Sequence, residues 1–207
     1  MFRTFSTFSL QSNTVPQPLC GSWITAGIST PSRSALTLTL GSATSSGNDA
    51  TNIFGGSAGQ SIAGMNALIV DPSGANAEDV LITSVLNNTV TLGYKKTGVG
   101  GGAGVVTEYS HVSGAFGTGS FIIPNGTANN FVVVAEDGNT GNFLYIGNSY
   151  NMTATFRRIF KLPKTSTNGN PYYYFATGYA FGNSFPMSEI WVLGTSGDLY
   201  TPFFVVD

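Results

Sequence analysis

Residues 68–92, LIVDPSGANAEDVLITSVLNNTVTL, predict three short β-strands separated by two turns. The first apolar run ends at Asp71-Pro72-Ser73-Gly74, where proline fixes φ and glycine permits a positive φ, so the chain must turn. Within residues 80–86, apolar and polar side chains alternate with the two-residue period of a half-buried strand. Asn87-Asn88 tolerates the left-handed region and predicts a hairpin into the third strand. The segment holds few groups that could do chemistry, so we interpret it as architectural.

Short strands joined by Gly, Asn and Pro turns are predicted along the rest of the chain. A turn-forming cluster at residues 137–141 lies between two β-forming runs, residues 131–135 and 143–147, and predicts a second hairpin. Residues 189–193 and 199–206 predict a closing hairpin. No convincing amphipathic helix appears in the sequence. We therefore expect an all-β fold: a short-stranded antiparallel sandwich or barrel with an extended N-terminal arm.

Composition divides the chain into three predicted segments. Residues 1–35, rich in Ser, Thr, Gln and Pro, are expected to form an extended N-terminal arm. Residues 36–125 are expected to form a β-module, and residues 126–207 a second β-module that packs with the first as one compact unit. The glycine-rich loop at residues 98–104 lacks the Lys-Ser/Thr ending of a P-loop, so we interpret it as a hairpin tip or an insertion.

The chain carries little charge: 9% of its 207 residues are charged and 42% are hydrophobic, against a usual charged fraction of about 25%. A soluble monomer usually carries more surface charge, so we expect an assembly subunit or a homo-oligomer, with a trimer favoured. The net charge of -2 offers no basic field for nucleic acid. No apolar run approaches the roughly 18 residues of a membrane span. Neither nucleic acid nor a membrane is therefore an expected partner.

Cofactor and metal chemistry finds little support in the sequence. The single cysteine, Cys20, has no second thiol for a disulfide, a CxxC pair or a zinc site. The chain has one histidine, His111, whereas a histidine-based metal cluster needs several. No GxSxG motif is present that would place a catalytic serine beside this histidine. We therefore predict no cofactor, no metal site, no catalytic residue and no enzymatic activity.

The acidic residues also lack a recognisable site pattern. The candidates for a carboxylate pair or a calcium site are Asp71, Glu78, Asp79 and Glu108. They lack the regular oxygen-ligand spacing that hard cations favour, so we interpret them as turn caps and surface charges. Glu136-Asp137 precedes a turn, where an aspartate most simply accepts hydrogen bonds from local backbone N–H groups.

A cluster of basic residues marks a candidate interface. Half of the eight basic residues fall within eight positions: Arg157, Arg158, Lys161 and Lys164. The segment favours a strand that ends at Pro163. Arginine forks pair well with carboxylates, so the cluster fits an acidic patch on a neighbouring subunit. The alternative is a solvated strand edge, where charge deters edge-to-edge aggregation.

Aromatic residues form a second candidate interface. The members are Tyr172, Tyr173, Tyr174 and Phe175, followed downstream by Trp191. Such rings serve as interface hot spots or as a platform on which sugars stack. The low charge already calls for an interface, so we favour a subunit contact and keep carbohydrate binding as the alternative.

Two groups of segments resemble structural patterns of tailed-bacteriophage virion proteins. The first resembles a small β-module common in those proteins; it consists of residues 70–78 (VDPSGANAE), 80–85 (VLITSV) and 88–92 (NTVTL), and His111 with Ser113-Gly114-Ala115. The second is similar to another phage structural pattern; it consists of residues 144–147 (LYIG), 160–162 (FKL) and 189–198 (EIWVLGTSGD).

The resemblance implies a mechanical role. Such modules occur in head decoration proteins, head fibres and tail-associated proteins, and in them the position of His111 suits a structural hydrogen bond. The leading expectation is a non-enzymatic capsid decoration or cement protein that bridges and stabilises major capsid subunits or other virion subunits. The protein would be made in the host cytoplasm and located in the virion. The alternative is a tail- or fibre-associated receptor-binding protein that contacts host glycans, and a hydrolase is a distant third.

Overall fold

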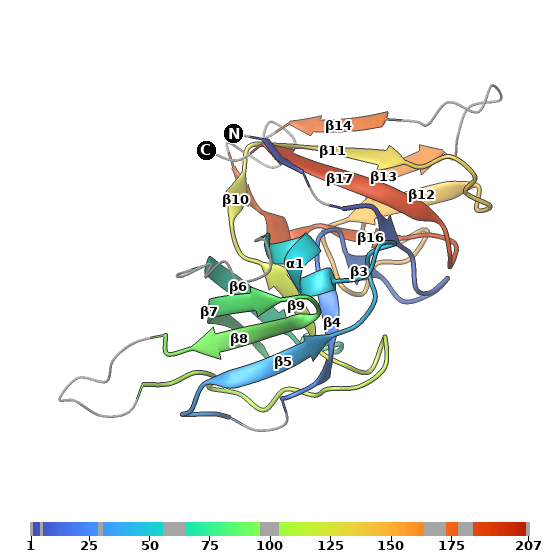
Figure 1. Ribbon diagram of the computed structural model, residues 1–207. Coiled ribbons are helices and arrows are strands. Elements are labelled where there is room, and N and C mark those ends of the chain that lie inside the picture. Colours follow the sequence, from blue (N-terminus) through green and yellow to red (C-terminus); the bar gives the residue numbers. More distant parts are fainter. Residues whose placement is uncertain are drawn as a thin grey trace. The chain divides into compact units, whose positions relative to one another are not determined.

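The computed structural model describes residues 2–4, 6–28, 31–55, 65–95, 104–163, 173–177 and 184–205. The protein is nearly all β, with 45% of residues in strands and 6% in helices, and its sheets are antiparallel (Figure 1). The expected all-β fold is therefore confirmed. The chain forms two compact units. The barrel unit contains residues 21–42 and 47–125, and the terminal unit contains residues 1–20, 43–46 and 126–207.

The barrel unit is built on six antiparallel strands that close in the order β4-β5-β8-β7-β6-β9. Their bounds are β4 (Ser22–Ala26), β5 (Leu36–Leu40), β6 (Met65–Val70), β7 (Ala77–Leu86), β8 (Thr89–Gly93) and β9 (Phe121–Pro124). The helix α1 (Asp49–Phe54) buries Ile53 and Phe54. It is shorter than two turns, so it leaves no helical period in the sequence. Among the described residues, no helix has the length and hydropathy needed to span a membrane.

The three strands predicted first in the sequence are β6, β7 and β8. The turn after β6 is closed by the Gly74 N–H, which donates to the Asp71 carbonyl at 2.7 Å, and Gly74 has a φ of +69°. Asn87 takes a φ of +53° in the β7–β8 hairpin, as its tolerance of the left-handed region predicts. Alternate residues of β7 are buried up to Ile82. A bulge then shifts the register, so that Val85 is the next buried side chain.

The terminal unit contains three sheets. One has the order β1-β17-β11-β14, with β2 also paired to β17; another has the order β13-β12-β16-β3; in the third, β10 pairs with β15. The bounds are β1 (Phe2–Thr4), β2 (Phe8–Ser9), β3 (Gln17–Pro18), β10 (Thr127–Ala128), β11 (Asn130–Ala135), β12 (Phe143–Gly147), β13 (Arg158–Pro163), β14 (Tyr173–Thr177), β15 (Phe185–Pro186), η2 (Met187–Glu189), β16 (Trp191–Leu193) and β17 (Leu199–Val205). The largest fully buried side chains of this unit are aromatic: Phe8, Phe131, Tyr200 and Phe204.

Two predicted hairpins are wrong. The turn at residues 137–141 exists, but it joins β11 to β12, which belong to different sheets. The turn before β17 likewise separates it from β16, which pairs with β12 and β3 instead. Turn-forming residues predict that the chain reverses, but they do not specify which strand becomes the hydrogen-bonding partner. The predicted end of a strand at Pro163 is confirmed by β13.

Residues 1–35 are not a separate arm, because they are divided between the two units. In the terminal unit, β1 and β2 pair with β17 and β3 pairs with β16. In the barrel unit, β4 is a full barrel strand. Strands of two to five residues are too short to show a hydrophobic period, which is why the segment looked irregular. They supply backbone partners that sheet edges otherwise lack.

Candidate functional site

A network of buried charged side chains lies at the end of the barrel where β6 stops and β7 begins. His111 Nδ1 is 2.8 Å from Asp71 Oδ1, and His111 Nε2 is 2.9 Å from Glu78 Oε1. The histidine is 1% exposed and both carboxylates are buried. Asp71 directly follows β6, Glu78 lies on β7, and His111 lies in the segment before β9. Barrel closure therefore assembles this network from three separate segments.

Each carboxylate receives further hydrogen bonds. Lys95, just after β8, forms a salt bridge with Glu78. The backbone N–H groups of Glu108 and Tyr109 also donate to Glu78, at 2.8 and 3.0 Å. Glu78 thus accepts hydrogen bonds from four groups when His111 is included.

Asp71 is held in a similar way. The Ser120 hydroxyl donates to Asp71 Oδ1 at 2.7 Å, and Asn76 Nδ2 donates to Asp71 Oδ2 at 2.9 Å. Among the described residues, no buried side-chain nitrogen or oxygen atom lacks a hydrogen-bond partner.

The pKa values of the two carboxyls are lowered. Burial raises the pKa of Asp71, but hydrogen bonds from His111, Ser120 and Asn76 outweigh it, so the pKa lies below 3.8. Burial also raises the pKa of Glu78, and hydrogen bonds from Lys95, the two backbone N–H groups and His111 bring it below 4.5. Both groups are therefore carboxylates at neutral pH.

The two carboxylates define what His111 can do. A neutral imidazole has one N–H and can donate to only one of them, whereas the imidazolium ion donates to both. Through its two ring nitrogens, His111 bridges Asp71 and Glu78. Buried carboxylates are tolerated where they are hydrogen-bonded or paired with a cation, as Glu78 is with Lys95.

The hydrogen bonds of the network tie three segments of the barrel unit together. Both ring nitrogens of His111 are engaged by carboxylates, and the buried Ser120 donates to Asp71 and not to the histidine. The prediction of a structural hydrogen bond for His111 is therefore confirmed. The interpretation as turn caps and surface charges is correct in part: Asp79 and Glu108 are exposed, and Asp71 accepts from Asn76 within its turn. The interpretation of Asp71 and Glu78 as surface charges is wrong, because both are buried, and Glu78 shares the inward face of β7 with Val80 and Ile82. Within the described ranges, no group of three or more His, Cys, Asp or Glu side chains is arranged to hold a metal ion.

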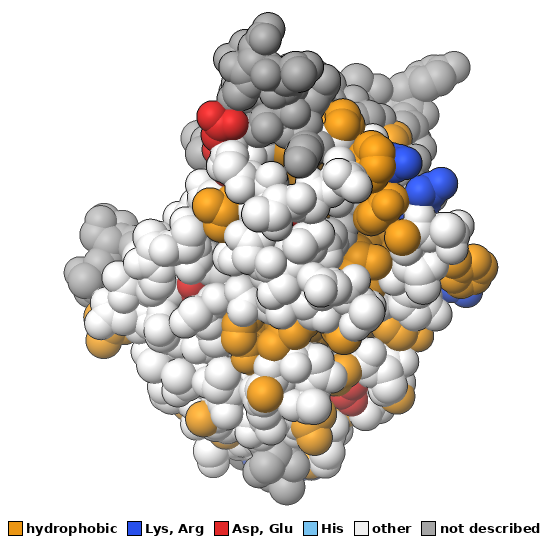
Figure 2. Space-filling view, turned by 90° about the vertical axis from the view of Figure 1, so that its right-hand side faces the viewer, with side chains coloured by type: hydrophobic (Ala, Val, Ile, Leu, Met, Phe, Trp, Pro, Cys, Tyr) orange, Lys and Arg blue, Asp and Glu red, His pale blue; other side chains and the backbone are white. Residues whose placement is uncertain are grey.

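A second cluster lies on the outer face of the β12–β13 pair in the terminal unit. Lys161 Nζ lies 3.6 Å from the ring centroid of Phe143, and Arg158 Cζ lies 5.6 Å from that of Tyr145. These contacts arise because the strand register places Tyr145 opposite Lys161. We call this cluster the cationic face. Phe143, Tyr145, Arg158 and Lys161 belong to the two strands, and we include Phe156 and Arg157, which directly precede β13 and whose ring and guanidinium are 5.1 Å apart. The cations are exposed, and Figure 2 shows Lys and Arg side chains beside hydrophobic ones on the surface.

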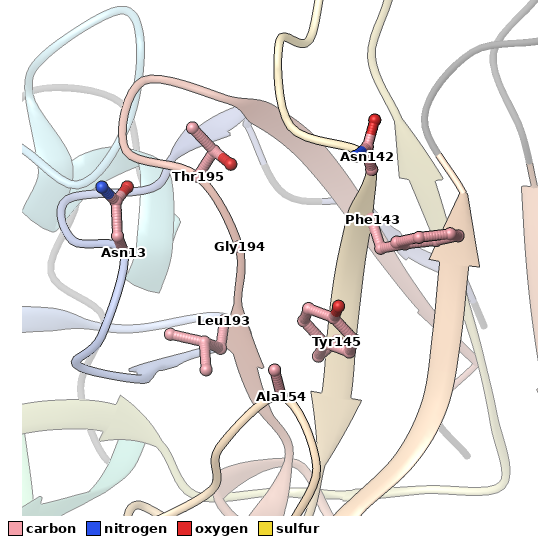
Figure 3. Close-up of a pocket in the computed structure, with 8 residues that line it drawn as sticks. All are labelled: Asn13, Asn142, Phe143, Tyr145, Ala154, Leu193, Gly194 and Thr195. Carbon is pink, nitrogen blue, oxygen red and sulfur yellow. The ribbon is translucent and has the colours of Figure 1, made fainter.

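A pocket of about 330 Å³ opens beside the cationic face. Its wall includes aromatic side chains of β12, Leu193 at the end of β16, and the polar side chains of Asn13, Asn142 and Thr195 (Figure 3). Phe143 and Tyr145 belong both to this pocket and to the cationic face.

The predicted interface residues have different positions in the structure. Arg157, Arg158 and Lys161 come together on the cationic face, whereas Lys164 and Tyr172 lie outside the described residues. Tyr173, Tyr174 and Phe175 belong to β14, which pairs with β11.

Trp191 does not belong to an exposed interface. It is 4% exposed, because β16 lies between β12 and β3, and its ring contacts Tyr150 edge-on. Phe143 and Tyr145 were missed as candidates, although their alternation with Leu144 and Ile146 places them together on the opposite sheet face.

No protein-family model, curated protein or solved structure matches this chain.

Proposed function

We propose that this chain is a non-enzymatic structural protein of a bacteriophage virion, and that it decorates or cements the head by bridging major capsid subunits. The observation that carries the proposal is the cationic face: the exposed cations Arg158 and Lys161 lie over aromatic rings of the adjacent strand β12, and exposed Arg157 directly precedes β13 and lies over the ring of its neighbour Phe156. This is chemistry for binding another protein surface rather than for turnover.

The composition of the cationic face suits a protein partner that is acidic. Arginine and aromatic side chains are enriched among interface hot spots. Contact with a ring limits the motion of each cation before binding, so less side-chain entropy is lost when a carboxylate partner arrives. A homo-oligomer, with a trimer favoured, would present several such faces at once, and multivalent attachment strengthens binding even where each contact is weak.

The phage assignment rests on the resemblance. Residues 70–92, which carry most of that resemblance, form the β6–β8 part of the barrel, and His111 joins them through Asp71 and Glu78. The first group of segments quoted for the resemblance thus lies within the barrel unit, and the second group lies in the terminal unit. The virion is accordingly the proposed location.

The first test is the copy number and location of the chain in intact particles, measured by cryo-electron microscopy. Hundreds of copies on the head lattice support decoration. A handful at a vertex or on the tail refutes decoration and favours the fibre or receptor-binding alternative.

The second test addresses the cationic face itself. Purified protein is added back to particles that lack it, and the bound fraction is compared for wild type and the triple variant Arg157→Glu, Arg158→Glu, Lys161→Glu. Arg33→Glu, an exposed arginine of the barrel unit, is the matched control. Loss of binding in the triple variant alone supports docking. Equal binding of all three proteins refutes docking through these charges. Their role would then be to prevent β13, an edge strand of its sheet, from pairing with the strands of other chains.

A further inference from the structure

The pocket of the terminal unit has walls that are fixed in place by the protein itself. The buried carboxylate of Asp198 accepts hydrogen bonds from the Thr140 N–H at 2.7 Å and the Gly141 N–H at 3.0 Å. These bonds hold the turn that precedes Asn142. On the opposite wall, the Ser196 N–H donates to Asn13 Oδ1 at 2.6 Å. A pocket with fixed walls loses little entropy when a ligand enters.

The polar groups of the pocket are amides and a hydroxyl. Because Asn13 Oδ1 already accepts from Ser196, its amide nitrogen has two N–H groups to offer. Among the described residues, no partner engages the side chain of Asn142, so it presents both donor and acceptor atoms. Thr195 adds a hydroxyl that serves either role. These three side chains are the kind that recognise ligand hydroxyl groups.

The remaining wall is apolar. In Figure 3 the Tyr145 ring lies between Leu193 and Phe143, and Asn142 and Thr195 lie toward one end of the pocket. Tyr145 is half-buried: Arg158 Cζ lies 5.6 Å from its ring centroid, and the Tyr145 side chain lines the pocket. An aromatic ring packs against a flat apolar face and leaves polar edges of the same ligand free to reach amides.

We infer that this pocket binds a neutral saccharide ring, with the C–H face of the sugar on Tyr145 and its hydroxyl groups on Asn13, Asn142 and Thr195. A sugar combines an apolar face with a polar edge, and the pocket has the same division. The ligand is neutral because no charged side chain lines the pocket, while the nearby cations Arg158 and Lys161 are engaged with aromatic rings. The volume of about 330 Å³ is at the small end for ligand sites, which suits one or two sugar rings.

This inference does not depend on a role in decoration. It also differs from carbohydrate binding by the tyrosine run at residues 172–175, because none of the pocket residues belongs to that run. A ligand of about a dozen heavy atoms in an open pocket is expected to bind with a dissociation constant on the order of 1 mM.

The experiment is a titration of the full chain, labelled with 15N, with methyl glucoside, methyl galactoside, methyl mannoside and N-acetylglucosamine. The side-chain amide signals of Asn13 and Asn142 report directly on the pocket. At least one sugar is expected to shift these signals in the millimolar range. Asn142→Ala should weaken that binding about fivefold or more, as for the loss of a hydrogen bond of ordinary strength. Tyr145→Thr, which keeps a β-branched side chain in the strand, should abolish it.

The matched control is Asn148→Ala, which removes another exposed asparagine of the terminal unit outside the pocket and should bind like wild type. The inference is overturned if none of the four sugars shifts the two amide signals, or if Asn142→Ala and Asn148→Ala bind equally. Glucuronic acid is titrated in parallel as a charged sugar. The inference is also overturned if glucuronic acid alone binds and does so in a salt-dependent way, because that result would assign recognition to the cations. Since Asn142→Ala is predicted to fold normally, a failure of Tyr145→Thr to fold would not obscure the result.

Discussion

Replacing Glu78 by Gln should destabilise the barrel unit strongly. The carboxylate accepts from Lys95, His111 and two backbone N–H groups. Glutamine has nearly the same shape, but its NH2 group faces donors and its single oxygen cannot replace two charged oxygens. The change leaves Lys95 without the counter-charge of its buried partner and removes a carboxylate oxygen that His111 contacts. Removing one partner of a buried ion pair costs about 3–5 kcal/mol.

That cost is large relative to the stability of such a unit. A domain of this size has a free energy of unfolding of about 5–15 kcal/mol, so the variant should lose about a fifth of it or more. The thermal midpoint of the barrel unit should fall by more than about 10 °C.

The two tryptophans allow the units to be followed separately. Trp23 lies in the barrel unit and Trp191 in the terminal unit, and both are buried. In a Trp191→Phe background, urea unfolding monitored by fluorescence therefore reports on the barrel unit. The matched control is Glu108→Gln, because Glu108 is 4.0 Å from the same lysine but its side chain is 60% exposed. This control should change the free energy of unfolding by less than about 1 kcal/mol. The argument fails if Glu78→Gln stays within 1 kcal/mol of wild type, or if the control costs as much.

Three further outcomes are expected. The folded state lowers the pKa values of Asp71 and Glu78 below 3.8 and 4.5, so the stability that these carboxylates give the barrel unit is fully present above those values and is lost as the pH falls below them. The urea concentration at the midpoint of unfolding should therefore drop in acid. A midpoint that does not change with pH would contradict the assigned hydrogen bonds. Asp198→Asn should lower the free energy of unfolding of the terminal unit by about 1–3 kcal/mol, because one oxygen of the buried acceptor is replaced by an NH2 donor that faces backbone N–H groups. A urea midpoint equal to that of wild type, followed by the fluorescence of Trp191, would refute this. Trp191→Ala should cost about 3–5 kcal/mol because the ring is buried, and a cost below 1 kcal/mol would indicate an exposed ring.

The alternation of residues in β7 predicts that Glu78 faces inward. In β7, residues 78, 80 and 82 share one face, so the two-residue period that buries Val80 and Ile82 also buries Glu78. Its partner was not predictable in the same way. His111 lies 33 residues away in a segment without regular structure, and only closure of the barrel brings the two together.

The strands near the N-terminus show the same limit. Phe8 pairs with Tyr200, and Trp191 with Pro18, so the partner strands are far apart in the sequence. Local propensity predicts strands and turns, but the choice of partner depends on packing across the whole unit. This is also why the turn at residues 137–141 was predicted correctly while its hairpin was not. The order of strands in a sheet is a non-local property.

The distribution of charge links the buried network to the cationic face. Four of the ten acidic side chains are buried: Asp49, Asp71, Glu78 and Asp198. Lys95 is committed to Glu78, so the surface carries even less charge than the total of 9% suggests. A surface so poor in charge favours association. Among the described side chains of the terminal unit, the exposed cations are Arg157, Arg158 and Lys161 of the cationic face, so the acidic partner that we propose would be attracted there. The orientation of a complex would then follow from this one sheet face rather than from the net charge of -2.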